Sequence, residues 1–281
     1  MSAARPPEGA RAEAAGEGTP VGERPGSPVK AWLRWPLRLL ALIGLLLLGP
    51  IGVLASGKLD LGMSWQRSDR SPTGQAPDPA IEQRAVVQVY GARTVRWRGA
   101  FGIHPWIAVK RAGADTYTTW QIVGWRARYG GDGLVENTGE APDTHWYGAY
   151  PQLLVEHRGP EAEAMIDGIE AAVARYPWRH VYGLWPGPNS NTFVAWVARE
   201  VPALRLDLPP TAIGKDYLGP SQFIARAPSG TGWQLSLLGL AGITLARDEG
   251  LELNLLGLGF GVDLDDLALR LPGVGKLPGP L

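Results

Sequence analysis

The residues best placed for chemistry lie in a short run of turn-forming residues at positions 185–193. The run reads Trp-Pro-Gly-Pro-Asn-Ser-Asn-Thr-Phe. Its prolines restrict the backbone, and its polar residues can open a helix. Ser190 would then lie in the positive field of a helix start, where a nucleophile is favoured. The alternative is that Asn189 or Ser190 only caps the helix, so this run has two interpretations.

A serine nucleophile needs a base, because its hydroxyl must lose a proton during attack. His104 lies in a segment with strand character, and Gln121 lies in the next such segment, where it would orient the imidazole. The backbone amides of Ser190 and Asn191 would stabilise an oxyanion. His145, which lies among turn residues, is a second candidate for the base. The alternative for His104 is a structural histidine that bonds a backbone carbonyl.

Tryptophans are the candidates for a binding surface, since the chain has 12 of them. We expect most to fill the core. A stacking surface for sugars or acyl chains is the functional alternative. The residues that would bind a ligand are Asn189, Asn191, Trp106, Trp146 and Trp185.

The composition excludes several classes of function. The 27 basic and 27 acidic side chains balance, so charge does not favour nucleic acid as a partner. The sequence has no cysteine, which excludes disulfides, thiol catalysis and thiolate metal sites. The four histidines have no ligand spacing, and the alternating glycines at 257, 259 and 261 have no dinucleotide-binding context. We therefore expect no metal and no cofactor.

An apolar segment indicates that the membrane is a partner. Residues 39–57 carry no charge, and at about 1.5 Å rise per residue they nearly match the hydrocarbon thickness. The basic residues before the segment slightly outnumber those after it. This bias predicts a single-pass membrane protein with its N-terminus in the cytoplasm and its main domain extracytoplasmic. A cleaved signal sequence and a buried soluble helix are the alternatives.

The pattern along the chain predicts five parts and an α+β fold. Residues 1–29 form a disordered tail, 30–57 the transmembrane helix with its flank, 58–80 a linker, 81–220 an α+β domain, and 221–281 a β-rich C-terminal extension.

Short β-branched and aromatic segments predict an antiparallel sheet in the domain, over residues 85–90, 94–97, 106–110 and 117–123. Apolar residues spaced three and four apart predict one central helix between Pro160 and Pro177, and a second begins near Asn191. Strands return in the extension at 233–238, 243–246, 251–256 and 267–271.

Several motifs between about residues 95 and 218 carry a resemblance to a known family. They are Gly-Ile-His-Pro-Trp-Ile-Ala-Val-Lys at 102–110, Val-Gly-Trp at 123–125, Trp-Tyr-Gly at 146–148, the run at 185–193, and Leu-Pro-Pro-Thr-Ala-Ile-Gly-Lys-Asp at 208–216. This segment resembles an uncharacterised bacterial family, domain of unknown function 3750. The run at 185–193 is the specific core of the resemblance.

A second, remote resemblance rests on the order of a strand with histidine and a helix that opens Asn-Ser-Asn-x-Phe. It is similar to the circularly permuted, papain-like NlpC/P60 folds, whose helix opens Asn-Cys-x-x-Phe. The resemblance implies that Ser190 matches the nucleophile and His104 the base. A serine cannot rest as an anion in the way that a cysteine thiolate can.

We therefore expect a membrane-anchored extracytoplasmic protein whose papain-like cleft is a non-catalytic binding or scaffolding module. The alternative is a cell-envelope amidase, peptidase or acyltransferase that uses Ser190 with His104. A cell-envelope ligand fits both hypotheses. Whether the protein is an enzyme, and which proteins it binds, stays open.

Overall fold

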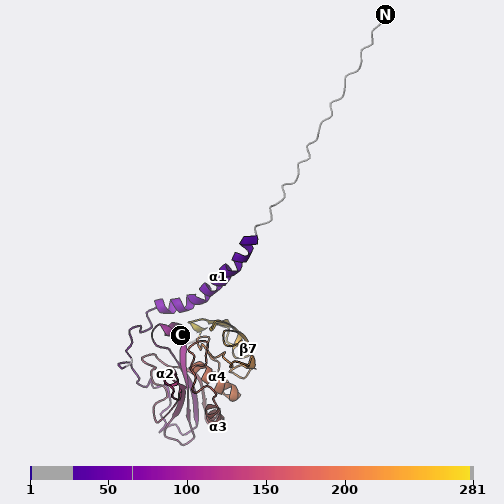
Figure 1. Ribbon diagram of the computed structural model, residues 1–281. Helices are drawn as coiled ribbons and strands as arrows, with labels where there is room; N and C mark the ends of the chain where they lie inside the picture. The colour runs from indigo at the N-terminus through magenta and orange to yellow at the C-terminus, as the bar shows by residue number, and fades with distance from the viewer. Residues whose placement is uncertain (2–27, 65, 279–281) are drawn as a thin grey trace. The chain divides into compact units, whose positions relative to one another are not determined.

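The computed structural model describes residue 1 and residues 28–64 and 66–278 (Figure 1). The tail expected at residues 1–29 therefore falls almost wholly outside the described residues. Among these residues, the helix α1 (Pro28–Ala55) is long and apolar enough to cross a membrane, over Arg34–Ala55. A signal sequence would meet the same criterion. Residues 42–281, which include the last turns of α1, form one compact unit.

The first sheet has five antiparallel strands in the order β4-β3-β2-β1-β5. Its strands are β1 (Val86–Arg93), β2 (Ile103–Lys110), β3 (Thr118–Ile122), β4 (Leu134–Thr138) and β5 (Gln152–Arg158). The strand predicted at 94–97 is wrong, because a 3₁₀ turn, η1 (Arg96–Ala100), occupies that place. Arg93 pairs with Ile103, so the chain between them must reverse direction and cannot continue as a strand.

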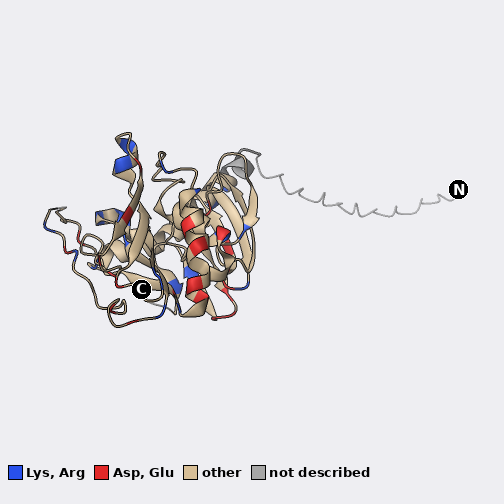
Figure 2. Cartoon of the chain, turned by 90° about the horizontal axis from the view of Figure 1, so that it is seen from below, with Lys and Arg blue, Asp and Glu red and all other residues tan. Residues whose placement is uncertain are grey.

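Two helices cover one face of this sheet. α3 (Pro160–Ala174) and α4 (Ser190–Glu200) are the central helices that the sequence predicts, and a short α2 (Gly124–Arg128) follows β3. Ile166 of α3 and Phe193 of α4 are fully buried in one core with Ile107 of β2. The acidic residues of α3 lie on its outer side (Figure 2). The mixed helix and antiparallel-sheet fold is thus confirmed.

The second sheet has seven antiparallel strands in chain order. After the 3₁₀ turn η2 (Pro202–Leu204) come β6 (Ile224–Arg226), β7 (Gly232–Leu237), β8 (Ala241–Ala246), β9 (Gly250–Leu255), β10 (Leu258–Asp263), β11 (Ala268–Leu271) and β12 (Gly275–Leu277). The glycines of β10 allow a close approach. A Cβ at Gly259 would lie 2.6 Å from the Glu252 carboxylate.

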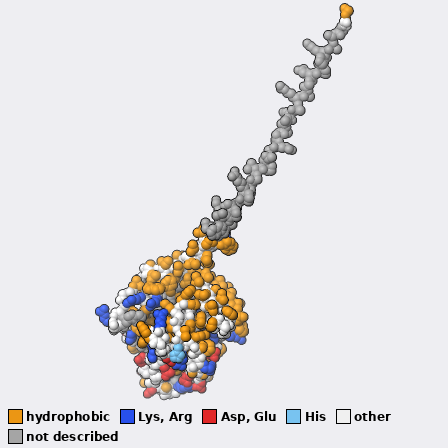
Figure 3. Space-filling view, viewed as in Figure 1, with side chains coloured by type: hydrophobic (Ala, Val, Ile, Leu, Met, Phe, Trp, Pro, Cys, Tyr) orange, Lys and Arg blue, Asp and Glu red, His pale blue; other side chains and the backbone are white. Residues whose placement is uncertain are grey.

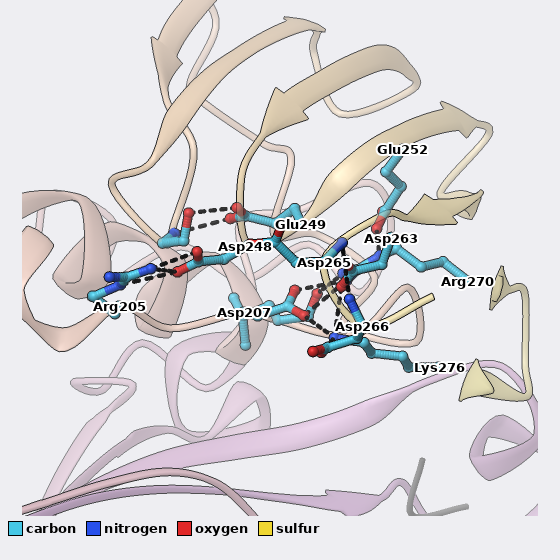
Figure 4. Close-up of polar contacts among 12 residues, drawn as sticks. Arg205, Asp207, Asp248, Glu249, Glu252, Asp263, Asp265, Asp266, Arg270 and Lys276 are labelled. Atoms are coloured by element: carbon cyan, nitrogen blue, oxygen red, sulfur yellow. Dashed lines mark hydrogen bonds and ion pairs between the residues drawn. The ribbon is translucent and has the colours of Figure 1, made fainter. Parts of the chain in front are cut away.

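The inner face of the second sheet is polar and charged (Figure 4). Glu252 lies between two cations, with Lys215 Nζ at 2.7 Å and Arg270 Nε at 2.6 Å. Burial raises the pKa of Glu252, but the two cations outweigh burial and the pKa is lowered. Arg270 also pairs with Asp207 at 2.8 Å, and Lys276 pairs with Asp207 and Asp263. This network joins residues 207–216 to the sheet.

The domain boundaries predicted after residues 80 and 220 stay predictions. The segment 58–80 is held against the domain at Asp143, whose Oδ2 accepts hydrogen bonds from Thr73 Oγ1 and the Gln75 amide.

Candidate functional site

The run at 185–193 begins α4 with a complete capping box. The Asn189 side-chain oxygen accepts hydrogen bonds from the amides of Asn191 at 2.9 Å and Thr192 at 3.2 Å. The Thr192 hydroxyl in turn accepts from the Asn189 amide at 3.0 Å. Asn189 is therefore the cap, and Ser190 is the first residue of the helix.

The same asparagines fix the helix start to the rest of the domain. Asn189 Nδ2 donates to the carbonyls of Leu184 and Ile213. Asn191 Nδ2 donates to the carbonyl of Ile103 at 3.2 Å and to that of Ile213 at 2.8 Å. Ile103 precedes His104 in β2, so Asn191 brings the start of α4 next to the histidine. The Asn191 side-chain oxygen is buried and has no hydrogen-bond partner among the residues that the structure describes.

His104 pairs with Gln121, as the sequence predicts, rather than with a backbone carbonyl. Its Nε2 lies 2.8 Å from Gln121 Oε1, across the neighbouring strands β2 and β3. Because an amide oxygen accepts, this orientation of Gln121 assigns the proton to Nε2 and leaves Nδ1 as the acceptor. Burial lowers the pKa of His104 to about 4, against the opposing effect of Gln121. The imidazole is thus neutral at pH 7.

The three candidate tryptophans lie in different surroundings. Trp146 is half-buried and stacks on His104, with ring centroids 3.7 Å apart and planes 4° apart. Trp106 is buried, and its Nε1 donates to the Pro142 carbonyl at 2.7 Å. Trp185 is 51% exposed and donates to the carbonyl of Leu256 in the second sheet. Trp106 and Trp146 belong to one aromatic cluster, because the Trp106 ring centroid lies 6.1 Å from that of Trp146 and 6.3 Å from that of His104. Trp185 makes no ring contact with this cluster among the described residues, and it is Trp146 that stacks on the imidazole.

The groups expected for acyl transfer are close in the fold but are not assembled. Within the described chain, Ser190 is buried and no hydrogen bond joins it to His104. The Asn191 amide, expected as an oxyanion donor, donates instead to Asn189. His145, the second candidate for the base, bonds the Ser71 carbonyl at 2.9 Å and lies 3.5 Å from Asp69. In this arrangement the helix start is capped rather than open to a substrate.

A cavity of about 960 Å³ lies beside Trp146 and is absent from the sequence predictions. Its wall contains Leu48 and Gly52 of α1, Ile103 of β2 and Leu154 of β5. These residues are far apart in the chain, so no local pattern could indicate the cavity. Trp146 lines it and also stacks on His104, and it therefore stands between the cavity and the imidazole.

Arg93, at the end of β1, also lines this cavity. Its guanidinium donates to the carbonyls of Gly99 at 2.9 Å, Gly273 at 2.5 Å and Val274 at 3.0 Å. Burial lowers its pKa, and no acid among the described residues pairs with it. Arg93 thus brings to the cavity lining a positive charge that has no carboxylate partner in the described part of the chain.

Comparison with known families identifies the segment that holds this site. Residues 84–217 match the family described as "Protein of unknown function (DUF3750)". The DUF3750 match runs from the start of the first sheet to the residues before β6, and it includes His104, Gln121 and Ser190. The expected resemblance to this family is therefore confirmed over that segment.

Comparisons with curated proteins and with solved structures found no further relative. No curated protein and no solved structure matches the chain. The remote resemblance to papain-like NlpC/P60 folds accordingly has no support beyond the residues that suggested it.

Proposed function

We propose that the protein is a membrane-anchored binding module whose cavity takes one amphiphilic molecule with an anionic group. The cavity of about 960 Å³ carries this proposal. Its volume is in the range of roughly 300 to 1,000 Å³ that is typical of small-molecule sites. Its wall includes the last turns of α1, so a membrane span at α1 would place the cavity at the membrane surface.

The lining supports an amphiphile. Leu48, Val53 and Leu154 give the cavity apolar walls. Its charged lining residues are Lys58, Arg93, Arg96 and Lys276 and the acids Asp60, Asp207 and Asp266. Asp207 and Asp266 are paired with Lys276, whereas Arg93 has no carboxylate partner among the described residues. A guanidinium has five N–H donors, and three of those of Arg93 are used by carbonyls. A phosphate or carboxylate group would accept the remaining donors and neutralise a half-buried cation.

Binding fits the site better than catalysis does. A serine nucleophile needs a base within about 2.6 to 3.2 Å, and Ser190 has no hydrogen bond to His104. A base with a pKa of about 4 is also poorly matched to proton transfer at neutral pH. The second candidate, an acyl hydrolase or transferase with Ser190 and His104, is favoured by the oriented His104–Gln121 pair beside the start of α4.

Two glycines of α1 provide a matched test of the cavity. A Cβ at Gly52 would meet no atom within 4 Å, and Gly52 lines the cavity. Gly44 has the same open space but does not line the cavity. Gly52→Trp therefore places a large side chain at the cavity wall with no clash at its Cβ, and Gly44→Trp is its control.

The measurement is a fluorescence-polarisation titration of the full chain in detergent with a fluorescent phosphatidic acid. We expect Gly52→Trp to weaken binding by about tenfold or more, and Gly44→Trp to bind as the wild type does. Equal binding by all three proteins, or no binding by the wild type, would contradict the proposal.

A further inference from the structure

The second sheet has its polar face inside and its apolar face outside, the reverse of the usual arrangement. Along β7, Gln234 is 1% exposed whereas Leu235 is 50% exposed. The register carries this alternation across the sheet, because Leu235 pairs with Ile243 and Ile243 pairs with Leu253. From β7 to β11, each outward residue is Ala, Val, Leu, Ile, Phe or Trp. Hydrophobic side chains gather over the surface where Figure 1 labels β7 (Figure 3).

The two ends of this sheet also differ in polarity. The turns at one end contain Leu238–Leu240, Leu256–Gly257 and Pro272–Val274, which are leucine, glycine, proline and valine only. The turns at the opposite end, 227–231, 247–249 and 264–267, contain Arg247, Asp248, Glu249, Asp265 and Asp266, together with the exposed Leu264 and Leu267. The sheet is therefore amphipathic along its strands as well as across its faces.

The apolar end of the sheet contacts the apolar helix. Gly49 of α1 lies so near the Pro272 carbonyl that a Cβ there would collide with it. A Cβ at Gly273 would likewise lie 2.6 Å from the Pro50 nitrogen. At about 1.5 Å per residue, Gly49 lies about 9 Å before the helix end at Ala55. The turn at 272–274 thus reaches the helix within the segment that is apolar enough to lie in a membrane.

We infer that the outer face of the second sheet lies in the lipid leaflet in which α1 ends. Without a partner, this face would expose a continuous patch of apolar side chains to water, which is unfavourable. A lipid surface is favoured over a second copy of the chain, because α1 and the apolar turns meet at the same end of the sheet. With Ala55 at the membrane surface, the turn at 272–274 would lie about 9 Å deep, within the roughly 5 to 10 Å to which interfacial segments enter a bilayer.

The polar end carries the residues expected at the lipid headgroups. Arg226 of β6 lies 4.5 Å from the ring centroid of Trp233 on the outer face. Trp233 pairs with both Arg226 and Leu245, on the side of the sheet where the charged turns lie. Tryptophan and arginine are favoured at the membrane–water interface, with the apolar residues deeper.

This inference rests on the membrane anchoring in the proposed function, but not on the ligand of the cavity. Because the chain has no cysteine, single cysteines can carry a nitroxide label in the full chain, reconstituted in phosphatidylcholine–phosphatidylglycerol vesicles. Leu253→Cys reports on the sheet face and Leu45→Cys on the anchor. Ile81→Cys, at a residue 77% exposed outside the sheet, is the control.

We expect the labels at 253 and 45 to collide more with oxygen than with a water-soluble nickel chelate, and the label at 81 to show the opposite. A label at 253 that favours the nickel chelate, while that at 45 favours oxygen, overturns the inference and leaves the anchor intact. Coupling between labels at 253 that disappears on dilution with unlabelled protein assigns the face to a second copy and also overturns it. A label at 45 that collides more with the nickel chelate than with oxygen overturns both the inference and the membrane anchoring by α1.

Discussion

The His104 Nε2 lies 2.8 Å from Gln121 Oε1, and this pair is closed on one side by the ring of Trp146. The imidazole is therefore oriented, buried and neutral at pH 7. Such a histidine can serve as an acceptor at Nδ1, but its protonation in the folded state is costly. Burial of the neutral histidine should therefore make the stability of the folded protein depend on pH.

The stability of the protein should fall as the pH falls from about 6.5 to about 4. The folded-state pKa of His104 is lowered to about 4 from the model-peptide value of 6.5, so the unfolded state binds the extra proton in this window. The stability is fully present above pH 6.5 and is lost by roughly 3 kcal/mol towards pH 4, at about 1.4 kcal/mol per pKa unit.

Denaturant unfolding at a series of pH values measures this loss. The His104→Gln variant should show a flatter profile than the wild type between pH 4 and 6.5. Parallel profiles for the two proteins would show that the histidine is not buried neutral.

The introduced thiol of Ser190→Cys distinguishes binding from catalysis, because it is the only thiol in the chain. The neutral His104 offers no positive charge at pH 7, and the amides of Asn191 and Thr192 are bonded to Asn189. We expect alkylation of the thiol to follow a pKa at or above about 8.5 and to be unchanged by His104→Ala. A pKa well below 8.5 that rises when His104 is removed would favour the hydrolase.

The loss of the helix cap should be more costly than the loss of the serine. Asn189→Ala removes a side chain that makes hydrogen bonds to two amides and two carbonyls, so a loss of about 2 kcal/mol or more is expected. Ser190→Ala should cost less, about 1 kcal/mol at most, because the buried Ser190 hydroxyl makes no hydrogen bond among the described residues. Chemical denaturation of both variants checks this order, and a reversed order would mean that Ser190 is the cap.

The buried network beneath the second sheet should be sensitive to the loss of one carboxylate. Glu252→Leu leaves the buried Lys215 and Arg270 without their shared partner, and we expect a loss of roughly 3 to 5 kcal/mol in the free energy of unfolding. Asp167→Ala, which removes an exposed partner of Arg111, should cost less than about 1 kcal/mol. Similar losses for the two variants in denaturant unfolding would contradict the buried network.

The orientation expected from the sequence predicts that residues after α1 lie outside the cytoplasm. An alkaline phosphatase fusion after Ala80 should be active, because the basic residues before the apolar segment favour the cytoplasmic side. An inactive but stable fusion would reverse the topology, and release of a shortened soluble form would indicate a cleaved signal sequence.

Local sequence predicted those parts of the fold that depend on neighbours in the chain. The spacing of Met165, Ile166 and Ile169 predicted α3, and Asn189 predicted the start of α4. The segment 233–238 predicted the strand β7 but not which of its faces is buried, because burial of Gln234 depends on Asp216, which lies 18 residues away. The cavity depends on contacts such as that of Arg93 with Gly273, across 180 residues, which no local pattern encodes.

The central claim, that the cavity holds an anionic amphiphile, is tested most directly by native mass spectrometry of the unmodified full chain. The protein is released from nanodiscs that contain equal amounts of phosphatidylcholine and phosphatidylglycerol. We expect one phosphatidylglycerol to stay bound per chain, because Arg93 provides a positive charge without a carboxylate partner among the described residues. Protein that is released without lipid, or that retains the two lipids equally, would contradict the account.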